Sequence, residues 1–129
     1  MKGAKILLVD DEEVFTRNMS KLLSSRGYEV SAVTSGDAAL RALESRAVDV
    51  IVLDLKMPGM DGLTTLKEIQ KLGLFVQVLI LTGHAAIDSA LEAMKLGAYD
   101  YLTKPCEIDE LVVKIEGAWG FRLHQSMGW

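Results

Sequence analysis

Three aspartates stand at the ends of two apolar runs and are the residues of this sequence best suited to chemistry. Asp10 and Asp11 follow the run at residues 6–9, and Asp54 follows the run at residues 48–53. If these runs are neighbouring parallel strands, the carboxylates converge at the sheet edge where ligands bind in such folds. Close carboxylates repel by a few kcal/mol per pair, and Mg²⁺, which prefers oxygen ligands, would offset that repulsion.

A hydroxyl and an ammonium follow the next two strand-like segments. Thr82 directly follows the run at residues 76–81, and Lys104 directly follows the segment at residues 99–103. Both would join the carboxylates on the same rim. Such a set suits the transfer of a phosphoryl group onto a carboxylate, where catalysis consists mainly of positioning and charge neutralisation.

The elements that position these residues alternate along the chain. Three short, nearly continuous apolar runs are typical of strands covered on both faces of a parallel sheet. A segment with alternating polar residues indicates an edge strand, and a fifth strand is short. The five predicted strands are residues 6–9, 28–33 (the edge), 48–53, 76–81 and 99–103.

Apolar residues between the strands recur at helical spacing and predict five amphipathic helices. The predicted core positions are Phe15, Met19, Leu22 and Leu23; Ala39, Leu40 and Leu43; Leu63, Leu66 and Ile69; Ile87, Ala90, Leu91 and Met94; and Ile108, Leu111, Val112, Ile115 and Trp119. Ser35 is the expected N-cap of the second helix, and Gly27, Gly73 and Gly97 are expected to end helices. The alternation predicts a single α/β domain, a doubly wound parallel sheet with helices on both faces.

Composition narrows the class of protein. The 129 residues fit one domain, and the net charge of −4 without a basic run argues against direct binding to nucleic acid or an anionic membrane. Residues 1–11 resemble neither a signal peptide nor a membrane span. The single cysteine, Cys106, excludes an internal disulfide. We expect a cytoplasmic protein.

Four segments together closely resemble the receiver domains of response regulators in two-component signalling. They are VDDEE (9–13), LDLKMPGMDG (53–62), LTG (81–83) and GAYDYLTKP (97–105), and the resemblance spans about residues 5–115. It implies a flavodoxin-like (βα)₅ fold with strand order 2-1-3-4-5. It also implies a cis bond between Lys104 and Pro105, and Pro58 and Gly59 shaping the loop after the third strand.

The resemblance assigns the acidic residues. Asp54 would be the phosphoacceptor, receiving the phosphoryl group from the phosphohistidine of a sensor histidine kinase. Asp11 and Asp54 would bind Mg²⁺ through their carboxylates, Lys56 through its backbone carbonyl, and Asp10 through water.

The remaining roles also follow from the resemblance. Lys104 would pair with Asp54 or its phosphate, and the Thr82 hydroxyl would bind a phosphoryl oxygen. Tyr101 would change rotamer together with Thr82. The side chains of Lys56 and His84 would overlook the acyl phosphate and tune its lifetime.

Two features fall outside these motifs. Cys106 is expected to open the last helix, where a helix N-terminus can lower a thiol pKa, although packing is the favoured role. Residues 1–116 are expected to form the receiver, and residues 117–129 to extend the last helix or begin a linker. Gly117 and Gly120 weaken the helical prediction there.

Several alternatives remain open. The chain is either a stand-alone receiver or the N-terminal domain of a larger regulator. Residues 83–105 resemble receivers that precede ATPase modules in transcriptional activators, which favours the second alternative. The expected partners are the kinase and an effector domain or protein, with homodimerisation open. We expect no enzyme activity beyond its own phosphorylation and dephosphorylation. A phosphatase of the haloacid dehalogenase type would need a second Asp two residues after its nucleophilic Asp. Lys56 occupies that position after Asp54, and Glu12 occupies it after Asp10. A flavin-binding module would need a Ser/Thr/Gly-rich loop where DDEE stands.

Overall fold

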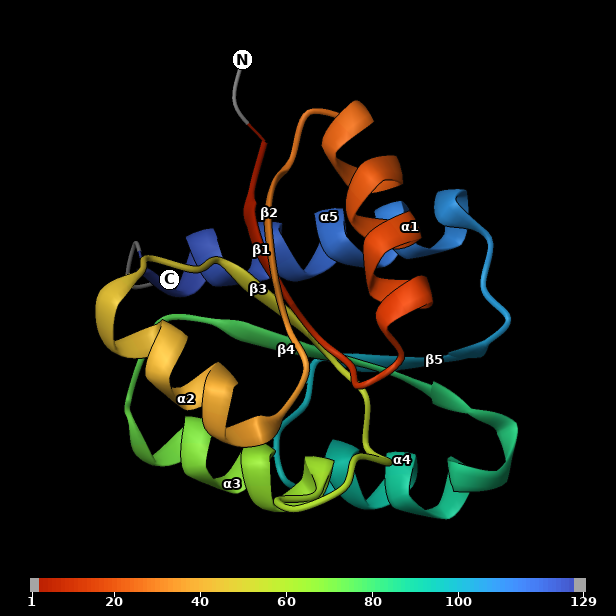
Figure 1. The fold of residues 1–129 in the computed structure, drawn as a ribbon. Coiled ribbons are helices and arrows are strands. Elements are labelled where there is room, and N and C mark those ends of the chain that lie inside the picture. The colour runs from red at the N-terminus through yellow and green to blue at the C-terminus, as the bar shows by residue number, and fades with distance from the viewer. Residues whose placement is uncertain (1–2, 127–129) are drawn as a thin grey trace.

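A five-stranded parallel sheet forms the centre of the computed structural model, which describes residues 3–126 and side chains as far as Phe121. The strand order is β2-β1-β3-β4-β5, as predicted (Figure 1). The strands are β1 (Lys5–Val9), β2 (Glu29–Val33), β3 (Val50–Leu53), β4 (Gln77–Gly83) and β5 (Asp100–Lys104). All neighbouring strands are parallel, so their carboxyl ends meet at one edge.

Helices cover both faces of the sheet (Figure 1). They are α1 (Glu13–Ser25), α2 (Gly36–Ser45), α3 (Gly62–Lys71), α4 (Ile87–Lys95) and α5 (Ile108–Ser126), with a short 3₁₀ turn, His84–Ala86, before α4. Buried side chains of α1 and α5 pack on one face, and those of α2, α3 and α4 on the other. The doubly wound architecture predicted from the sequence is therefore confirmed.

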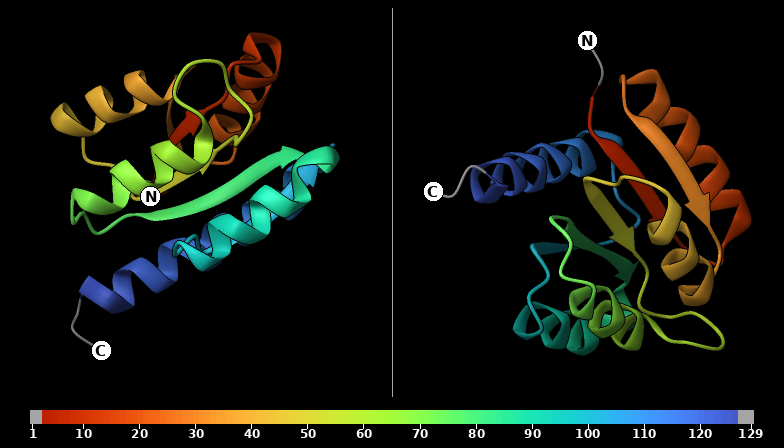
Figure 2. Two further views of the ribbon diagram at one scale, coloured as in Figure 1. Left: turned by 90° about the horizontal axis from the view of Figure 1, so that it is seen from below. Right: turned by 90° about the vertical axis from the view of Figure 1, so that its left-hand side faces the viewer.

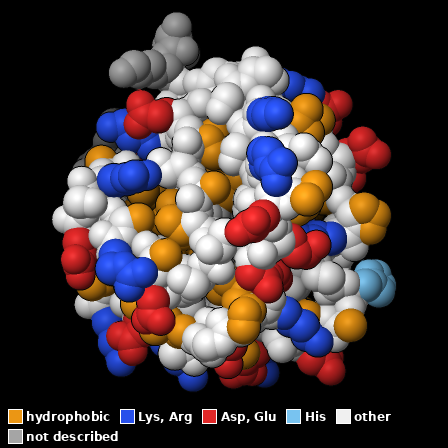
Figure 3. Space-filling view, viewed as in Figure 1, with side chains coloured by type: hydrophobic (Ala, Val, Ile, Leu, Met, Phe, Trp, Pro, Cys, Tyr) orange, Lys and Arg blue, Asp and Glu red, His pale blue; other side chains and the backbone are white. Residues whose placement is uncertain are grey.

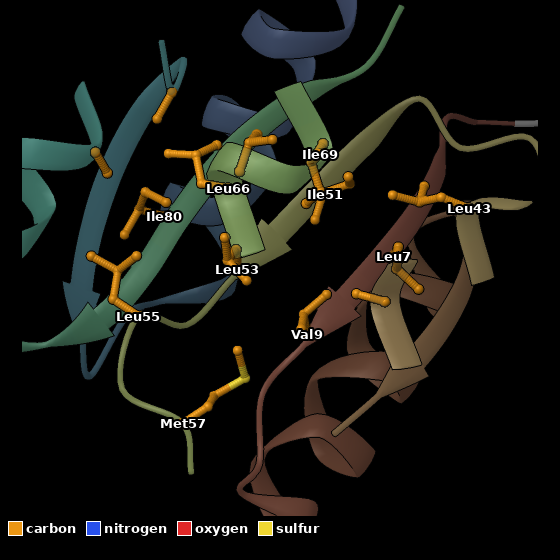
Figure 4. Packing of buried hydrophobic residues seen from close by; sticks show 14 of the residues in the cluster. Leu7, Val9, Leu43, Ile51, Leu53, Leu55, Met57, Leu66, Ile69 and Ile80 are labelled. Carbon is orange, nitrogen blue, oxygen red and sulfur yellow. The ribbon is translucent and has the colours of Figure 1, made fainter. Parts of the chain in front are cut away.

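The core lies in these two layers because successive strand residues point to opposite faces. Leu7, Val9, Ile51, Leu53 and Ile80 point toward α2, α3 and α4 (Figure 4). Their neighbours in sequence belong to the layer under α1 and α5. Both sheet faces are thus apolar, which accounts for the nearly continuous apolar runs of β1, β3 and β4.

Strand boundaries differ from the prediction by one or two residues. β3 begins at Val50, and just before it the Asp49 side chain accepts the backbone N–H of Lys5 at 2.8 Å while the Asp49 N–H donates to Lys5 O at 2.8 Å. β4 continues one residue past Thr82, and β5 ends on Lys104 rather than before it. The edge position of β2 is confirmed.

Two of the predicted core leucines were placed wrongly. Leu22 in α1 and Leu91 in α4 are 46% and 48% exposed. Each stands one residue from the buried centre of its stripe, Leu23 and Ala90. One residue turns a helix by about 100°, which moves these side chains to the rim of the apolar face.

The predicted helix ends are confirmed where local chemistry determines them. Ser35 Oγ accepts the N–H of Ala38 at the start of α2. Gly27, Gly73 and Gly97 have positive φ angles after α1, α3 and α4, a conformation in which a Cβ would be strained.

α5 continues through both glycines that argued against it. A Cβ at Gly117 would lie 2.6 Å from the Tyr99 hydroxyl, so the glycine leaves room for the Tyr99 side chain against α5. Nothing in the structure explains Gly120, where a Cβ would meet no atom within 4 Å. In the right-hand view of Figure 2, the C-terminal half of α5 projects away from the rest of the domain.

One face of the molecule carries mixed charge. On the face in Figure 3, acidic and basic side chains are interspersed and neither sign forms a continuous area. Within the described part of the chain, no helix is both long and apolar enough to cross a bilayer.

Candidate functional site

The two buried aspartates are brought together by the register of β1 and β3. Val9 pairs with Leu53, so Asp10 and Asp54 leave adjacent strands at the same level. The Asp54 N–H donates to Val9 O at 2.9 Å, and the Asp10 N–H donates to Val33 O at 3.2 Å. The ladder thus extends one residue beyond each strand and fixes both backbones. Both residues are buried, which is rare for Asp without compensating partners.

Asp54 accepts two hydrogen bonds on the same oxygen. The Thr82 hydroxyl donates to Oδ1 at 2.8 Å and the Lys56 N–H donates to it at 3.2 Å. Thr82 is fully buried near the end of β4, so the register of the sheet determines its position. The hydroxyl is therefore already at the acceptor and has no distance to travel toward it.

Lys104 provides the positive charge of the site. Its Nζ lies 2.6 Å from Asp10 Oδ2, 2.6 Å from Glu12 Oε1 and 3.8 Å from Asp54 Oδ2. The ammonium also lies 4.4 Å from the centre of the Phe15 ring, at cation–π distance. One cation thus faces three carboxylates, and its two short contacts are to Asp10 and Glu12.

Burial and charge act against each other here. Burial raises the pKa of Asp10 above its ordinary value, and the hydrogen bond from Lys104 offsets only part of that effect. Burial alone would lower the pKa of Lys104, but its hydrogen bonds to Asp10 and Glu12 outweigh burial and raise it. The lysine is therefore held in its charged form.

Asp10, Glu12 and Asp54 form an acidic cluster that could hold a cation. One carboxylate oxygen from each lies within 4.8 Å of the others. Hard oxygen donors of this kind fit Mg²⁺, which binds one or two carboxylates and completes its shell with water or phosphate oxygens. The predicted ligand Asp11 is exposed and is not a member of this cluster.

Glu12 was missed as a site residue. Its position depends on the turn after β1, where the Asp10 side chain accepts the Glu12 N–H at 2.9 Å. The sequence signal was the unbroken acidic run from Asp10 to Glu13, but its spacing does not show which acid turns inward.

The loop from Asp54 to α3 is held by a close backbone contact. The Gly62 N–H donates to Leu55 O at 3.0 Å, and a Cβ at Gly62 would lie 2.3 Å from Leu55 Cα. Asp61 caps α3 by accepting the Thr64 N–H at 2.8 Å, and that bond lowers the pKa of Asp61. The loop that carries Lys56 N–H to Asp54 is therefore anchored at its far end.

The other predicted residues surround this centre. The side chains of Lys56 and His84 are exposed, and His84 opens the turn after β4. Tyr101 is half-buried on β5 and packs at the margin of the α2–α3–α4 core. The Lys104–Pro105 bond is cis, as the resemblance implied.

Cys106 does not open the last helix, because α5 begins two residues later at Ile108. Burial raises the pKa of its thiol, and the charges of Glu110 and Glu107 raise it further. Activation of the thiol by a helix N-terminus is therefore wrong for this residue. Cys106 packs half-buried against the α1–α5 core, in agreement with the favoured structural role.

Comparison with known families identifies the class of domain. The response regulator receiver domain family matches residues 6–116, which is most of the chain. The chain belongs to this receiver family. The match favours the receiver interpretation of the acidic loop over the phosphatase and the flavin-binding interpretations.

Curated relatives of this receiver are transcriptional regulators. It is 41% identical over 113 residues to the transcriptional regulatory protein ZraR of Escherichia coli O157:H7, covering 88% of this chain and 26% of that protein. It is 37% identical over 118 residues to the DNA-binding transcriptional regulator NtrC of Salmonella typhimurium, and this match covers 92% of this chain and 25% of that protein. The chain thus spans about a quarter of the length of these relatives.

Solved structures agree with this receiver over nearly its whole length. A response regulator receiver domain protein from Clostridium thermocellum matches with a TM-score of 0.90 and 38% identity, covering 95% of this chain and 99% of that one. NtrX from Brucella abortus, solved in complex with ADP, matches with a TM-score of 0.92 and 34% identity, and the match covers 98% of this chain and 29% of that one.

Proposed function

We propose that this receiver is a switch activated by phosphorylation of Asp54, with a sensor histidine kinase as donor. The observation that carries the proposal is the surrounding of Asp54: a buried carboxylate hydrogen-bonded by Thr82, with Lys104 facing its second oxygen. A purely structural aspartate would pair closely with its lysine. Here Asp54 Oδ2 stays 3.8 Å from Nζ, which is beyond hydrogen-bond range.

In the proposed reaction Asp54 is the nucleophile. A carboxylate oxygen bonds to phosphorus while the phosphorus–nitrogen bond of the donor phosphohistidine breaks, and its electron pair leaves with the imidazole. We assign the attack to Oδ2, because Oδ1 is held by Thr82 and Lys56 N–H. Lys104, held in its charged form, would neutralise the transferred group as Oδ2 joins it.

Mg²⁺ is the proposed cofactor, and Asp10 and Asp54, the two buried acids of the cluster, are placed to hold it. When bound it would neutralise phosphoryl charge during transfer. The family resemblance adds Asp11 and the Lys56 carbonyl as ligands. Asp11 would have to turn inward from its exposed position to take part.

The proposed output is a change in the face formed by α4, β5 and α5. Phosphorylation adds about −1.5 to −2 charge and three strong acceptors beside Thr82. The Thr82 hydroxyl would exchange Asp54 Oδ1 for a phosphoryl oxygen, a small displacement at the end of β4. Thr82 pairs with Thr103 on β5, the strand that carries Tyr101, so the displacement reaches the side chain proposed to change rotamer.

The proposed setting is the control of transcription. The curated relatives are transcriptional regulators more than three times as long, so an effector domain or a partner protein would respond to the altered face. We propose residues 1–116 as the receiver and residues 117–129 as an extension of the last helix or the start of a linker. Catalysis would be limited to the receiver's own phosphorylation and dephosphorylation, in the cytoplasm.

Intact-protein mass spectrometry after incubation with acetyl phosphate and Mg²⁺ tests the proposal. The wild type should gain one phosphoryl group, and Asp54→Asn should gain none because an amide is a poor nucleophile. Asp37→Asn, which changes an exposed acid in the first turn of α2 outside the site, is the matched control and should gain the phosphoryl group like the wild type. Undiminished labelling of Asp54→Asn would overturn the assignment.

A further inference from the structure

Lys104 is shared unequally among three carboxylates, and the sharing suggests a role for Glu12. Nζ lies 2.6 Å from Asp10 and Glu12 but 3.8 Å from Asp54. The two short contacts are charge-assisted hydrogen bonds, whereas the third is a looser ion pair. The lysine is thus held toward the β1–α1 turn and away from the proposed acceptor.

We propose that Glu12 is a positioning residue that holds Lys104 away from Asp54 until the phosphoryl group arrives. The inference rests on the proposed function, because it concerns the lysine that neutralises that group. On phosphorylation Lys104 would leave Glu12 and bind a phosphoryl oxygen, while keeping its bond to Asp10.

Solvent exposure determines which carboxylate releases the lysine. The Glu12 side chain is 61% exposed, so water can replace the ammonium at little cost. The Asp10 side chain is 5% exposed, and a buried carboxylate without its cation is strongly destabilised. Glu12 is therefore the weaker of the two competitors.

The backbone of Glu12 is fixed while its side chain is free to turn. Its N–H donates to Asp10 Oδ1 at 2.9 Å, and its carbonyl accepts the Thr16 N–H at 3.0 Å in the first turn of α1. Phe15 in the same turn lies beside the ammonium. Release of Lys104 thus needs a side-chain rotation and no movement of α1.

Competition between Glu12 and the phosphoryl group for Lys104 determines the direction in which a Glu12 substitution shifts anion affinity at Asp54. Every contact that Lys104 makes only in the resting state opposes the phosphorylated state. Removing the Glu12 charge should therefore favour an anion on Asp54. An exposed ion pair supports an effect of about two- to fivefold in affinity.

The test is titration of the full chain with beryllofluoride, a stand-in for the aspartyl phosphate, at saturating Mg²⁺. Glu12→Gln should bind it about two- to fivefold more tightly than wild type. Glu13→Gln is the matched control, because it removes the adjacent exposed charge without a contact to Lys104. The NMR signal of the Lys104 side chain should also shift less on binding in Glu12→Gln, since its resting contact is already gone.

Three results would overturn the inference. Equal tightening in Glu12→Gln and Glu13→Gln would show a general charge effect. Weaker binding of both Mg²⁺ and beryllofluoride by Glu12→Gln would make Glu12 a metal ligand instead. If Glu12→Gln leaves both beryllofluoride binding and the Lys104 NMR signal unchanged, Glu12 has no role in positioning Lys104. If the wild type itself binds no beryllofluoride at Asp54, the proposed function fails first, so the two failures are distinguishable.

Discussion

At the scale of single residues, the site combines one buried carboxylate, the proposed nucleophile Asp54, with hydrogen-bond donors that are already in place. Thr82 and the Lys56 N–H both bind Asp54 Oδ1, and Lys104 balances the charge from the far side. A site organised in this way needs little rearrangement during phosphoryl transfer, which favours catalysis by positioning.

The exposed side chains of Lys56 and His84 should set the lifetime of the phosphorylated state. An acyl phosphate hydrolyses when water approaches in line, so truncating a side chain that overlooks this path should speed decay several-fold. Lys56→Ala and His84→Ala should therefore lose the phosphoryl group faster, with Mg²⁺ affinity little changed. Decay rates of the phosphorylated proteins provide the measurement. Lys67→Ala, an exposed lysine on α3, is the control, and equal decay in all variants would refute this role.

Part of the site could be predicted from sequence and part could not. Asp10, Asp54, Thr82 and Lys104 follow from strand ends, because parallel strands carry them to one edge. Glu12 and Asp11 could not be told apart, because the turn after β1 decides which acid points inward. That turn depends on one side-chain hydrogen bond, from the Glu12 N–H to Asp10, which leaves no periodic signal.

At the scale of elements, helix termini anchor the loop that follows Asp54. Asp61 caps α3, and Gly62 lets the helix approach Leu55 closely. Helical periodicity predicted Leu22 and Leu91 as core residues, but both are exposed at the edge of the apolar face of their helices. The residue pattern distinguished the buried strands from the edge strand β2, whereas the full strand order was implied by the family resemblance. Strand ends depended on contacts such as Asp49 with Lys5.

The Asp61 cap gives a prediction with a defined pH dependence. Asp61→Ala should lower the free energy of unfolding at pH 7 by about 1 kcal/mol, and Asp61→Asn should lower it much less. The folded-state pKa lies below 3.8, so the ionic part of this stabilisation is present above that value. It is lost as pH falls through the folded-state pKa. Urea unfolding at pH 7 and near pH 3 checks this, and a wild-type advantage over Asp61→Asn that grows on acidification would contradict it.

At the scale of the whole molecule, the acidic cluster should trade stability for function. The charge of Asp54 contributes to the raised pKa of Asp10, which is a sign of repulsion between them. In EDTA, Asp54→Asn should therefore be more stable than wild type by about 1 kcal/mol. Asp11→Asn should change stability less, because Asp11 is exposed.

Mg²⁺ should reverse that order. A ligand that binds only the folded state stabilises it by about 2.7 kcal/mol at a hundredfold excess over its dissociation constant. The gain should be large for wild type and small for Asp54→Asn, which lacks one acid of the cluster. Melting curves in EDTA and in Mg²⁺ measure both effects, and a wild type indifferent to Mg²⁺ would count against the proposed metal site.

The central claim is that chemistry at Asp54 changes a distant face of the domain. The most direct test is to record amide NMR spectra in Mg²⁺ before and after adding beryllofluoride, with Asp54→Asn as the control. The account predicts shifts from Asp54 through Thr82 to Tyr101 and the residues of α4, and none in the control. Shifts in the wild type that remain beside Asp54, or equal shifts in Asp54→Asn, would contradict it.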